Sequence, residues 1–562
     1  MSHRPGNAEI ANQLARLSSL MEIAGENPFR IRAIRTGAES VAAAPMRIAD
    51  LAHDEPALRS VPGIGAGIAA LIREYVDTGH LESFEVLQNQ IPEGLIEVIE
   101  IQGVGAKTAK KLYELAGIRD LESLSIAIDN GTVANTKGLG AKLAEKIAVG
   151  LESIKRRTGR HRIGDALPVA VALAEQITEA LGGDSRVEVT GSLRRWQETI
   201  GNIDLLATGR TGEIEQVLTA FNIIEDISID GDRVIGKHPL GFQIAIHAAD
   251  HAAFGTRWLE TTGPPEHLSL LGPALETPVP EEREVYDRLG LPWIAPEFRQ
   301  GVDELDRAQS GELDNVIRIE DVRGELHSHT VWSDGAGTIE EMAEAARDRG
   351  YAYLGISDHS HSLGVANGLD RARLLAQGAD ILEASARLGF PLFRSSEVEV
   401  LRDGALDFDD DTLRGLDVVI ASTHTGWTRP RAELMARIHR ALDGGRVDIL
   451  AHPSGQLIEE RDPGDFNFPE MFAIATANGT ALEINADPAR LDLKAEHAQQ
   501  ALELGNLIAI NCDAHRPDGF RSLIYGVGIA RRAFTPRDRV INCWEIDRLS
   551  AWLVERHAFR HS

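Results

Sequence analysis

The pattern of apolar and polar positions over residues 320–562 repeats in seven similar units. Each unit has a short apolar run that ends in polar residues, and the runs lie at 322–330, 352–360, 392–400, 416–425, 447–455, 480–486 and 507–515. Helical patterns, such as those of 339–350 and 498–506, separate the runs. Alternating strands and helices are typical of a parallel sheet, and seven such units predict a closed, barrel-like (β/α)7 domain.

A glycine turn followed by a helical pattern occurs three times near the start of the chain, at 61–72, 101–112 and 136–147. Each copy has an apolar residue between two glycines, and the six glycines are Gly63, Gly65, Gly103, Gly105, Gly138 and Gly140. Glycines permit a tight turn that exposes backbone N–H groups at a helix start, where a phosphate oxygen can bind. A single copy would indicate only a tight turn between helices. Three copies predict helix-hairpin-helix motifs that bind the DNA backbone without reading its sequence.

The distribution of charge agrees with this interpretation. The formal net charge of −28 argues against a protein that coats nucleic acid over its whole surface. Residues 101–162 nevertheless contain 12 Lys and Arg against 6 Asp and Glu, whereas residues 163–320 contain 12 against 28. The lysines that follow the second and third glycine turns are Lys107, Lys110, Lys111, Lys137, Lys142 and Lys146. We therefore expect the N-terminal third to bind any DNA backbone.

Length and composition limit the class of protein. A chain of 562 residues is too long for one core, so three or more domains are expected. Its two cysteines, Cys512 and Cys543, form no CxxC motif, which argues against a thiolate zinc site and a disulfide framework. No apolar run approaches membrane-spanning length, and the N-terminus lacks the apolar core of a signal peptide. We expect a cytoplasmic monomer that binds no membrane.

One predicted strand, 201–209, has an unusual pair of polar residues. Asn202 and Asp204 face the same side, because strand side chains alternate. Two carboxylates at these positions could jointly hold divalent cations on a substrate phosphate, but a neutral amide cannot replace one of them. The strand is either a catalytic strand that has lost an acid or one that was never catalytic.

Imidazole and carboxylate side chains recur at the ends of the predicted barrel strands. His327 and His329 stand two residues apart on the first strand, and Asp513 and His515 repeat this spacing on the last. Other strand ends supply Asp334, Asp358, His359, Glu397, His424 and His452. A single histidine would indicate only a buried or surface residue, but the series at one rim predicts a metal site. Nitrogen and oxygen donors without thiolate suit Zn²⁺, Mn²⁺ or Fe²⁺, and clustered metals suit phosphoester hydrolysis.

The N-terminal segment 7–41, followed by the first glycine turn, resembles the small helical domain of the family X DNA polymerases. In members with deoxyribose-phosphate lyase activity, a lysine after this turn forms a Schiff base. The matching position here is Leu71, and Gly67 stands where another lysine is common. That chemistry requires an amine nucleophile, so the resemblance predicts that lyase activity is lost.

Residues 189–209 extend the resemblance to family X, whose pattern is Gly-Ser, two arginines and a Gly-Asp-x-Asp strand. In the family, the Gly-Ser and an arginine hold the incoming triphosphate, two aspartates bind two metals, and a third aspartate on a later strand helps to activate the primer hydroxyl. The residues that match are Gly191, Ser192, Arg194, Arg195 and Asp204. The first aspartate is replaced by Asn202, and the third falls on Ala245, or on Gln243 if the register slides by two.

The nucleotide pocket of the family is also altered. Glu260 and Thr261 replace an aromatic pair that packs on the deoxyribose, and Pro264 and Pro265 replace a Ser-Lys pair. The resemblance therefore implies a strand that derives from a nucleotidyl-transfer site and has lost its activity. Asp204 alone should bind Mg²⁺ weakly.

The barrel residues resemble the PHP (polymerase and histidinol phosphatase) domain, whose nine ligands bind three metals. The positions that fit this pattern are His327, His329, Asp334, His359, Glu397, His424, His452, Asp513 and His515. Asp358 is expected to orient a ligand. In bacterial and archaeal family X polymerases, a C-terminal PHP domain supplies a manganese-stimulated 3′–5′ exonuclease and related end-processing activity.

These observations predict a helical domain with the first hairpin (1–90), a second helix-hairpin-helix domain (91–160), a degenerate polymerase-like palm and thumb of α+β fold (161–315) and a PHP barrel (320–562). The resemblance implies a DNA-repair phosphoesterase that acts on gapped DNA or on 3′ ends. Three alternatives remain open: an active gap-filling polymerase, a small-molecule phosphatase of the histidinol-phosphate type, and a non-enzymatic DNA scaffold.

Overall fold

The computed structural model describes residues 5–44, 47–61, 63–99, 101, 104–157, 159–221 and 224–560. The chain divides into two compact units, Met1–Thr158 and Gly159–Ser562. No helix in the described ranges has both the length and the apolar character that a membrane crossing requires.

The first unit is helical and is built around the predicted glycine turns. Its longer helices are α1 (Asn7–Ala24), α2 (Pro28–Ala43), α4 (Ala66–Thr78), α7 (Ala106–Ala116), α8 (Leu121–Asp129) and α10 (Ala141–Arg157). Short helices lie between them: α3 (Glu55–Arg59), α5 (Glu82–Gln88), α6 (Leu95–Val98) and α9 (Thr132–Asn135). Isoleucine and leucine side chains from most of these helices share one apolar core.

Each predicted glycine turn leads directly into a helix. Gly65 and Gly105 precede the first residues of α4 and α7, and α10 begins directly after Gly140. Gly63 has a φ of 86°, and a Cβ at this position would lie 2.1 Å from Ser40 Oγ, so only glycine fits. Gly103 lies outside the described residues.

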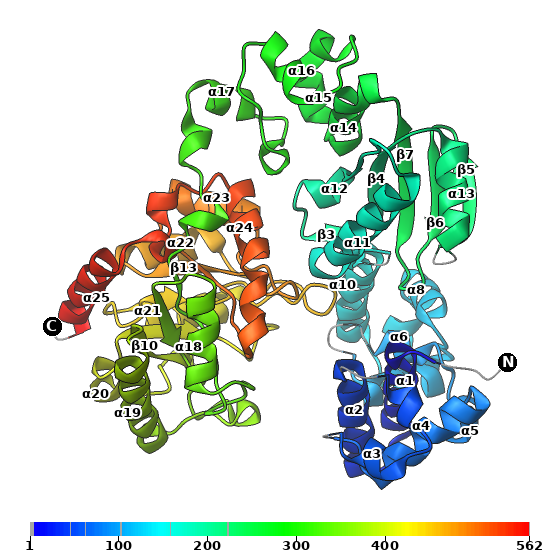
Figure 1. Cartoon of the computed structure of the whole chain (residues 1–562). Coiled ribbons are helices and arrows are strands. Elements are labelled where there is room, and N and C mark those ends of the chain that lie inside the picture. Colours follow the sequence, from blue (N-terminus) through cyan, green and yellow to red (C-terminus); the bar gives the residue numbers. More distant parts are fainter. Residues whose placement is uncertain are drawn as a thin grey trace. The chain divides into compact units, whose positions relative to one another are not determined.

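The second unit begins with a five-stranded sheet in the order β2-β4-β7-β6-β5. The strands are β2 (Val187–Val189), β4 (Asn202–Thr208), β5 (Glu225–Asp230), β6 (Arg233–Lys237) and β7 (Gln243–Ala249). β4 and β7 are parallel, whereas the other neighbours are antiparallel. The helices α11 (Ile163–Leu181) and α13 (Thr211–Phe221) pack beside this sheet, and α14 (Phe254–Thr262), α15 (Pro265–Leu271), α16 (Arg283–Arg288) and α17 (Glu304–Gln309) follow it (Figure 1).

The second unit then forms the predicted seven-stranded parallel sheet, in the order β14-β13-β12-β11-β10-β9-β8. Its strands are β8 (Gly324–Glu325), β9 (Tyr353–Ile356), β10 (Leu392–Glu399), β11 (Val418–Ser422), β12 (Ile449–Leu450), β13 (Ala481–Asn485) and β14 (Ile508–Asn511). Just beyond the first and last strands, Ser328 pairs in parallel with Ala514, which brings the two edges together. The predicted barrel form is therefore confirmed.

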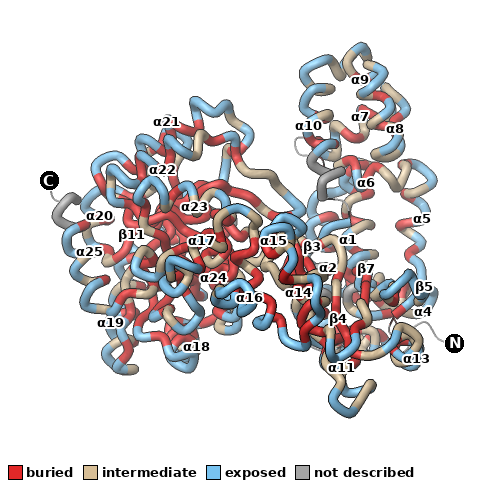
Figure 2. Tube along the Cα trace, turned by 90° about the horizontal axis from the view of Figure 1, so that it is seen from above, coloured by how far each residue is buried: buried red, intermediate tan, exposed pale blue. Residues whose placement is uncertain are grey.

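Helices surround the barrel, and its strands are buried. The helices are α18 (Ile339–Asp348), α19 (Arg371–Leu388), α20 (Asp410–Arg414), α21 (Arg431–Leu442), α22 (Phe468–Ala477), α23 (Ala495–Glu503), α24 (Leu523–Arg532) and α25 (Ile546–Arg560). Figure 2 shows buried trace around β11 and exposed trace along α19 and α20. All five residues of β11 are buried, as expected for a strand covered on both faces.

Candidate metal centre

The barrel brings the nine predicted ligands together at one rim. His327, His329, His359, His424 and His452 follow the ends of strands β8, β9, β11 and β12, and Asp513 and His515 follow β14. Glu397 lies within β10, and Asp334 lies in the loop after β8. Parallel strands place their carboxyl ends at the same edge, which explains why residues far apart in sequence meet here.

Three groups of side chains each have ligand atoms that all lie within 4.8 Å of one another. The groups are His329, Asp334, His359 and His515; His327, His329, Glu397 and Asp513; and His359, Glu397 and His424. The shared members His329, His359 and Glu397 link the three groups into one cluster. His452 joins this cluster through Glu397, since its Nε2 lies 2.9 Å from Glu397 Oε1.

Unpaired polar atoms in the cluster indicate that it binds cations. Among the described residues, the buried atoms without a hydrogen-bond partner include His327 Nε2, His329 Nδ1, His359 Nδ1, His452 Nδ1 and Glu397 Oε2. Leaving such atoms unpaired inside a protein is costly. Divalent cations would satisfy imidazole and carboxylate donors at once, so the residues fit the predicted metals.

The surrounding charges hold the cluster in the protonation states that ligands need. Burial would raise the pKa of Glu397, but His359, His424 and His327 hold it well below its usual value. Burial would likewise raise the pKa of Asp513, yet the neighbouring His327 and His329 keep it well below its usual value. Burial, together with His515 and His359, lowers the pKa of His329 to about 3. Ionised carboxylates and a neutral imidazole are the forms that bind metal.

A second layer of carboxylates, which the sequence analysis missed, holds the ligands in place. Glu483 on β13 has its Oε1 2.8 Å from His327 Nδ1 and accepts the backbone N–H of His452 with its Oε2. Glu399 Oε2 lies 2.7 Å from His424 Nδ1. The signal was present in the sequence, because Glu399 stands two residues after Glu397 and therefore faces the same side of β10.

The structure places Asp358 beside the loop that carries Asp334. Its carboxylate accepts the backbone N–H groups of Thr330 and Ser333 and the hydroxyl of Thr330. Ser333 in turn lies 3.2 Å from Asp334 Oδ1. Its contact with a ligand is therefore indirect, and a role in orienting Asp334 stays a prediction.

Two ligands have unusual backbone geometry. His452 and Asp513 have φ values of 28° and 52°, in the left-handed region that disfavours residues other than glycine. Such strain is typical of functional sites, where the surrounding structure enforces it. Arg490 adds a positive charge at the same rim, with its Nε 3.7 Å from Asp513 Oδ2.

The polymerase-like strand lies on the five-stranded sheet, in the register that the sequence predicts. Asp204 pairs with Ala245 across β4 and β7, and Asn202 pairs with Gln243, so neither register restores an acid. Asn202 Nδ2 donates to Asp204 Oδ1 at 2.5 Å. Asp204 also packs against Gly191, where a Cβ would lie 2.5 Å from its Oδ2.

The two consecutive arginines of this region have different surroundings. Arg194 forms a bidentate ion pair with Glu282, at 2.8 and 2.9 Å, and its guanidinium lies 3.4 Å from the centre of the Trp258 ring. Arg299 binds the same carboxylate of Glu282 at 2.7 Å. Arg194 is therefore already neutralised inside the protein, whereas Arg195 donates to the backbone oxygen of Thr262.

The lysines of the hairpins are available to a ligand. Lys107, Lys111, Lys137, Lys142 and Lys146 are exposed, and none forms an ion pair with any residue that the structure describes. Lys110 instead donates to the backbone oxygen of Ala24. Free ammonium groups beside exposed helix starts suit phosphate oxygens.

Comparisons with known proteins follow the same division of the chain. Residues 5–81 match the helix-hairpin-helix domain, residues 95–153 the SAM-like helix-hairpin-helix tandem and residues 325–487 the PHP domain. The chain is 34% identical over 570 residues to the DNA polymerase/3'-5' exonuclease PolX of Bacillus subtilis (strain 168), which covers 97% of this chain and 99% of that protein. It is 25% identical over 231 residues to a probable phosphatase of Shewanella sp. (strain MR-4), covering 39% of this chain and 86% of that protein. A probable phosphatase of Thermoanaerobacter sp. (strain X514) is 25% identical over 243 residues, covering 41% of this chain and 94% of that protein.

Proposed function

This chain belongs to the PolX family of family X DNA polymerases, which combine helix-hairpin-helix domains with a C-terminal PHP domain, and we propose that its active centre is the PHP cluster, acting as a metal-dependent 3′–5′ exonuclease on DNA. The observation that carries the proposal is the cluster of nine imidazole and carboxylate ligands with buried, unpartnered nitrogen atoms. The three groups of donors suit three divalent cations, with Mn²⁺, Zn²⁺ or Fe²⁺ as candidates.

The residues of the rim have distinct tasks in this proposal. Bound divalent cations supply Lewis acidity, which polarises phosphoryl oxygens and makes water nucleophilic at neutral pH. Glu483 and Glu399 fix the rings of His327 and His424, so that their Nε2 atoms face Glu397. Arg490 places positive charge beside Asp513, where it would attract a phosphodiester.

The first unit would deliver the DNA. Its three glycine turns expose backbone N–H groups, and its free lysines can neutralise phosphates without regard to sequence. The polymerase-like sheet would position the DNA without catalysing synthesis. Asn202 and Ala245 stand where two of three carboxylates are needed, and this supports the loss of nucleotidyl transfer.

Two other functions have specific support. The name of the Bacillus subtilis relative favours an active polymerase, which the missing carboxylates oppose. The probable phosphatases resemble only part of the chain, about two-fifths of it, and favour a small-molecule phosphatase. The helix-hairpin-helix units oppose that alternative, because a small phosphoester has no use for them.

The proposal is tested with the full-length protein on gapped and 3′-tailed DNA labelled at the 5′ end. Metal is removed with a chelator and then restored as Mn²⁺, Zn²⁺ or Fe²⁺, and bound metal is measured by elemental analysis. We expect stepwise shortening from the 3′ end that disappears with the metal and returns with it. Cleavage that survives complete removal of the metal would contradict the proposal.

A further inference from the structure

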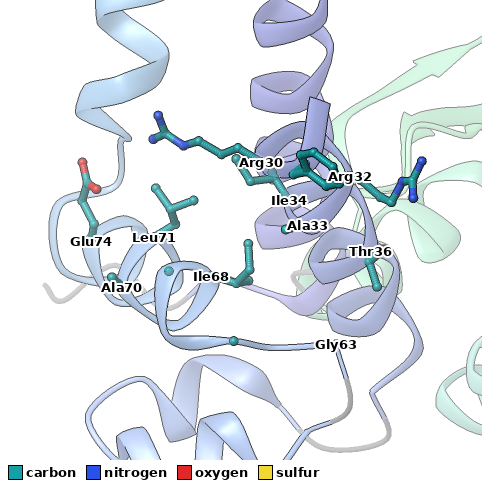
Figure 3. A pocket seen from close by; sticks show the side chains of 13 residues that line it. Arg30, Arg32, Ala33, Ile34, Thr36, Gly63, Ile68, Ala70, Leu71 and Glu74 are labelled. Carbon is teal, nitrogen blue, oxygen red and sulfur yellow. The ribbon is translucent and has the colours of Figure 1, made fainter. Parts of the chain in front are cut away.

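A cavity of about 640 Å³ lies in the first unit, between helix α2 and the first glycine turn. Figure 3 shows Ile68 and Leu71 of α4 and Arg30 of α2 facing this space, with Gly63 on the turn below. The wall on the side of α4 consists of Gly67, Ile68, Ala70 and Leu71, and it ends at Glu74. This wall is apolar and carries one carboxylate but no cation, so it suits a neutral, flat group better than a phosphate.

Phe29 lines the same cavity and is unusually exposed. Its side chain is 80% exposed, the largest value among the exposed large apolar residues described in this chain. Its position is nevertheless well defined, because Asn27 accepts the backbone N–H of Phe29 and caps α2. An exposed aromatic ring on a rigid helix start is a surface on which a base can stack.

Two cations adjoin this ring. Arg30 and Arg32 are exposed, and neither forms an ion pair with a described residue, whereas Arg35 of the same helix is paired with Glu22. Arg32 also lines a second cavity, of about 770 Å³, together with Thr36, Gly105 and Lys107. The two cavities share Arg32 and Thr36. A strand held at the second hairpin could therefore continue past Arg32 to the ring of Phe29.

We propose that the cavity beside Phe29 binds an unpaired base at the end of a DNA strand. Phe29 stacks on the base, the apolar wall of α4 encloses it, and Arg30 and Arg32 bind the phosphates on either side. The inference rests on the proposed function in one respect, namely that DNA lies along the hairpins of the first unit. It adds a specificity for DNA with an unpaired end over blunt duplex.

The test uses the full-length protein in EDTA, which prevents cleavage, and DNA carrying 2-aminopurine as its terminal unpaired base. Stacking on Phe29 should quench the fluorescence of this base when the wild-type protein binds. Phe29→Ala should abolish the quenching and weaken binding to the tailed DNA roughly 5- to 100-fold, as expected for the loss of one stacking contact. Phe29→Trp should preserve both signals, because its ring also stacks.

Matched controls separate this inference from the binding of DNA itself. Ile126→Ala removes another exposed apolar side chain of the first unit, 57% exposed on α8, and should change neither signal. Blunt duplex should bind wild type and Phe29→Ala equally. Equal quenching and affinity in wild type and Phe29→Ala on tailed DNA would overturn the inference while leaving the proposed function intact. Absence of any DNA binding by wild type would overturn both.

Discussion

The carboxylate of Glu483 lies 2.8 Å from Nδ1 of His327. A carboxylate only accepts hydrogen bonds, so this contact places the imidazole proton on Nδ1 and leaves the lone pair of Nε2 free. That Nε2 lies 3.3 Å from Glu397 Oε2 and 3.5 Å from Asp513 Oδ1, and it has no hydrogen-bond partner. Three groups with free electron pairs face one another, which a cation would stabilise.

Glu483→Gln should lower metal affinity by about 10- to 100-fold while the protein stays folded. Both oxygens of Glu483 accept hydrogen bonds, from His327, Asn511, His452 and Asn485. An amide would turn a donor toward one of these donors in either orientation. Metal affinity is measured by competition with a chromophoric chelator, and Glu503→Gln, at the exposed end of α23, is the matched control. Equal affinities for the two variants would show that Glu483 does not position His327.

His327→Ala and Asp513→Ala should each remove bound metal and nuclease activity together, because both residues belong to the same four-residue group. His361→Ala is the control, since His361 is exposed and pairs with Asp407, away from the cluster. Elemental analysis and cleavage of 3′-tailed DNA give the two readouts. Nuclease activity that persists in both ligand variants would assign the cleavage to another site.

The sequence predicted the ligands well but not their supports. His327, His329, Asp513 and His515 follow strands at a spacing of two, a pattern that only a shared rim explains. Glu483 could not be recognised in this way, because it lies inside a strand whose end carries no ligand. Its role depends on which ring it faces across the barrel, and that is determined by the packing of β13 against β12 and β14.

Primer extension on gapped DNA should stay at background with Mg²⁺ or Mn²⁺. Asp204 faces Ala245 across the sheet and is already hydrogen-bonded to Asn202, so it cannot hold two cations. The double variant Asn202→Asp and Ala245→Asp should gain little, since Pro264 and Pro265 remain in the nucleotide pocket. Robust templated extension by wild type, abolished by Asp204→Ala, would show that the site is active.

The palm region also shows where sequence comparison is silent. Matching residues identified Arg194 and Arg195 as a pair, but consecutive residues on a short helix point in different directions. Only the structure shows that Arg194 is bound to Glu282, 88 residues later in the chain. Such long-range ion pairs leave no local pattern.

Asp492→Asn should change the pH dependence of stability. Burial raises the pKa of Asp492 from 3.8 to about 6, although Ser454 and Gly455 donate to it. The unfolded chain loses this proton near pH 4 and the folded chain near pH 6, so wild type loses stability as the pH rises through this window, by about 3 kcal/mol. The melting temperature of wild type should therefore fall relative to Asp492→Asn between pH 4 and pH 7. Parallel melting curves against pH would refute this assignment.

The most direct test of the account compares two substrates in the full-length protein with Lys107, Lys137 and Lys142 replaced by alanine. Wild type should cleave 3′-tailed DNA with a steep dependence on salt, and the triple variant should lose about 3 from the slope of a log–log plot, near 0.9 per phosphate contact. Hydrolysis of bis(4-nitrophenyl) phosphate at the metal centre should be unchanged, and Lys237→Ala, on β6, serves as the control. If the triple variant cleaves DNA as well as wild type at every salt concentration, the hairpins do not deliver the substrate to the PHP site.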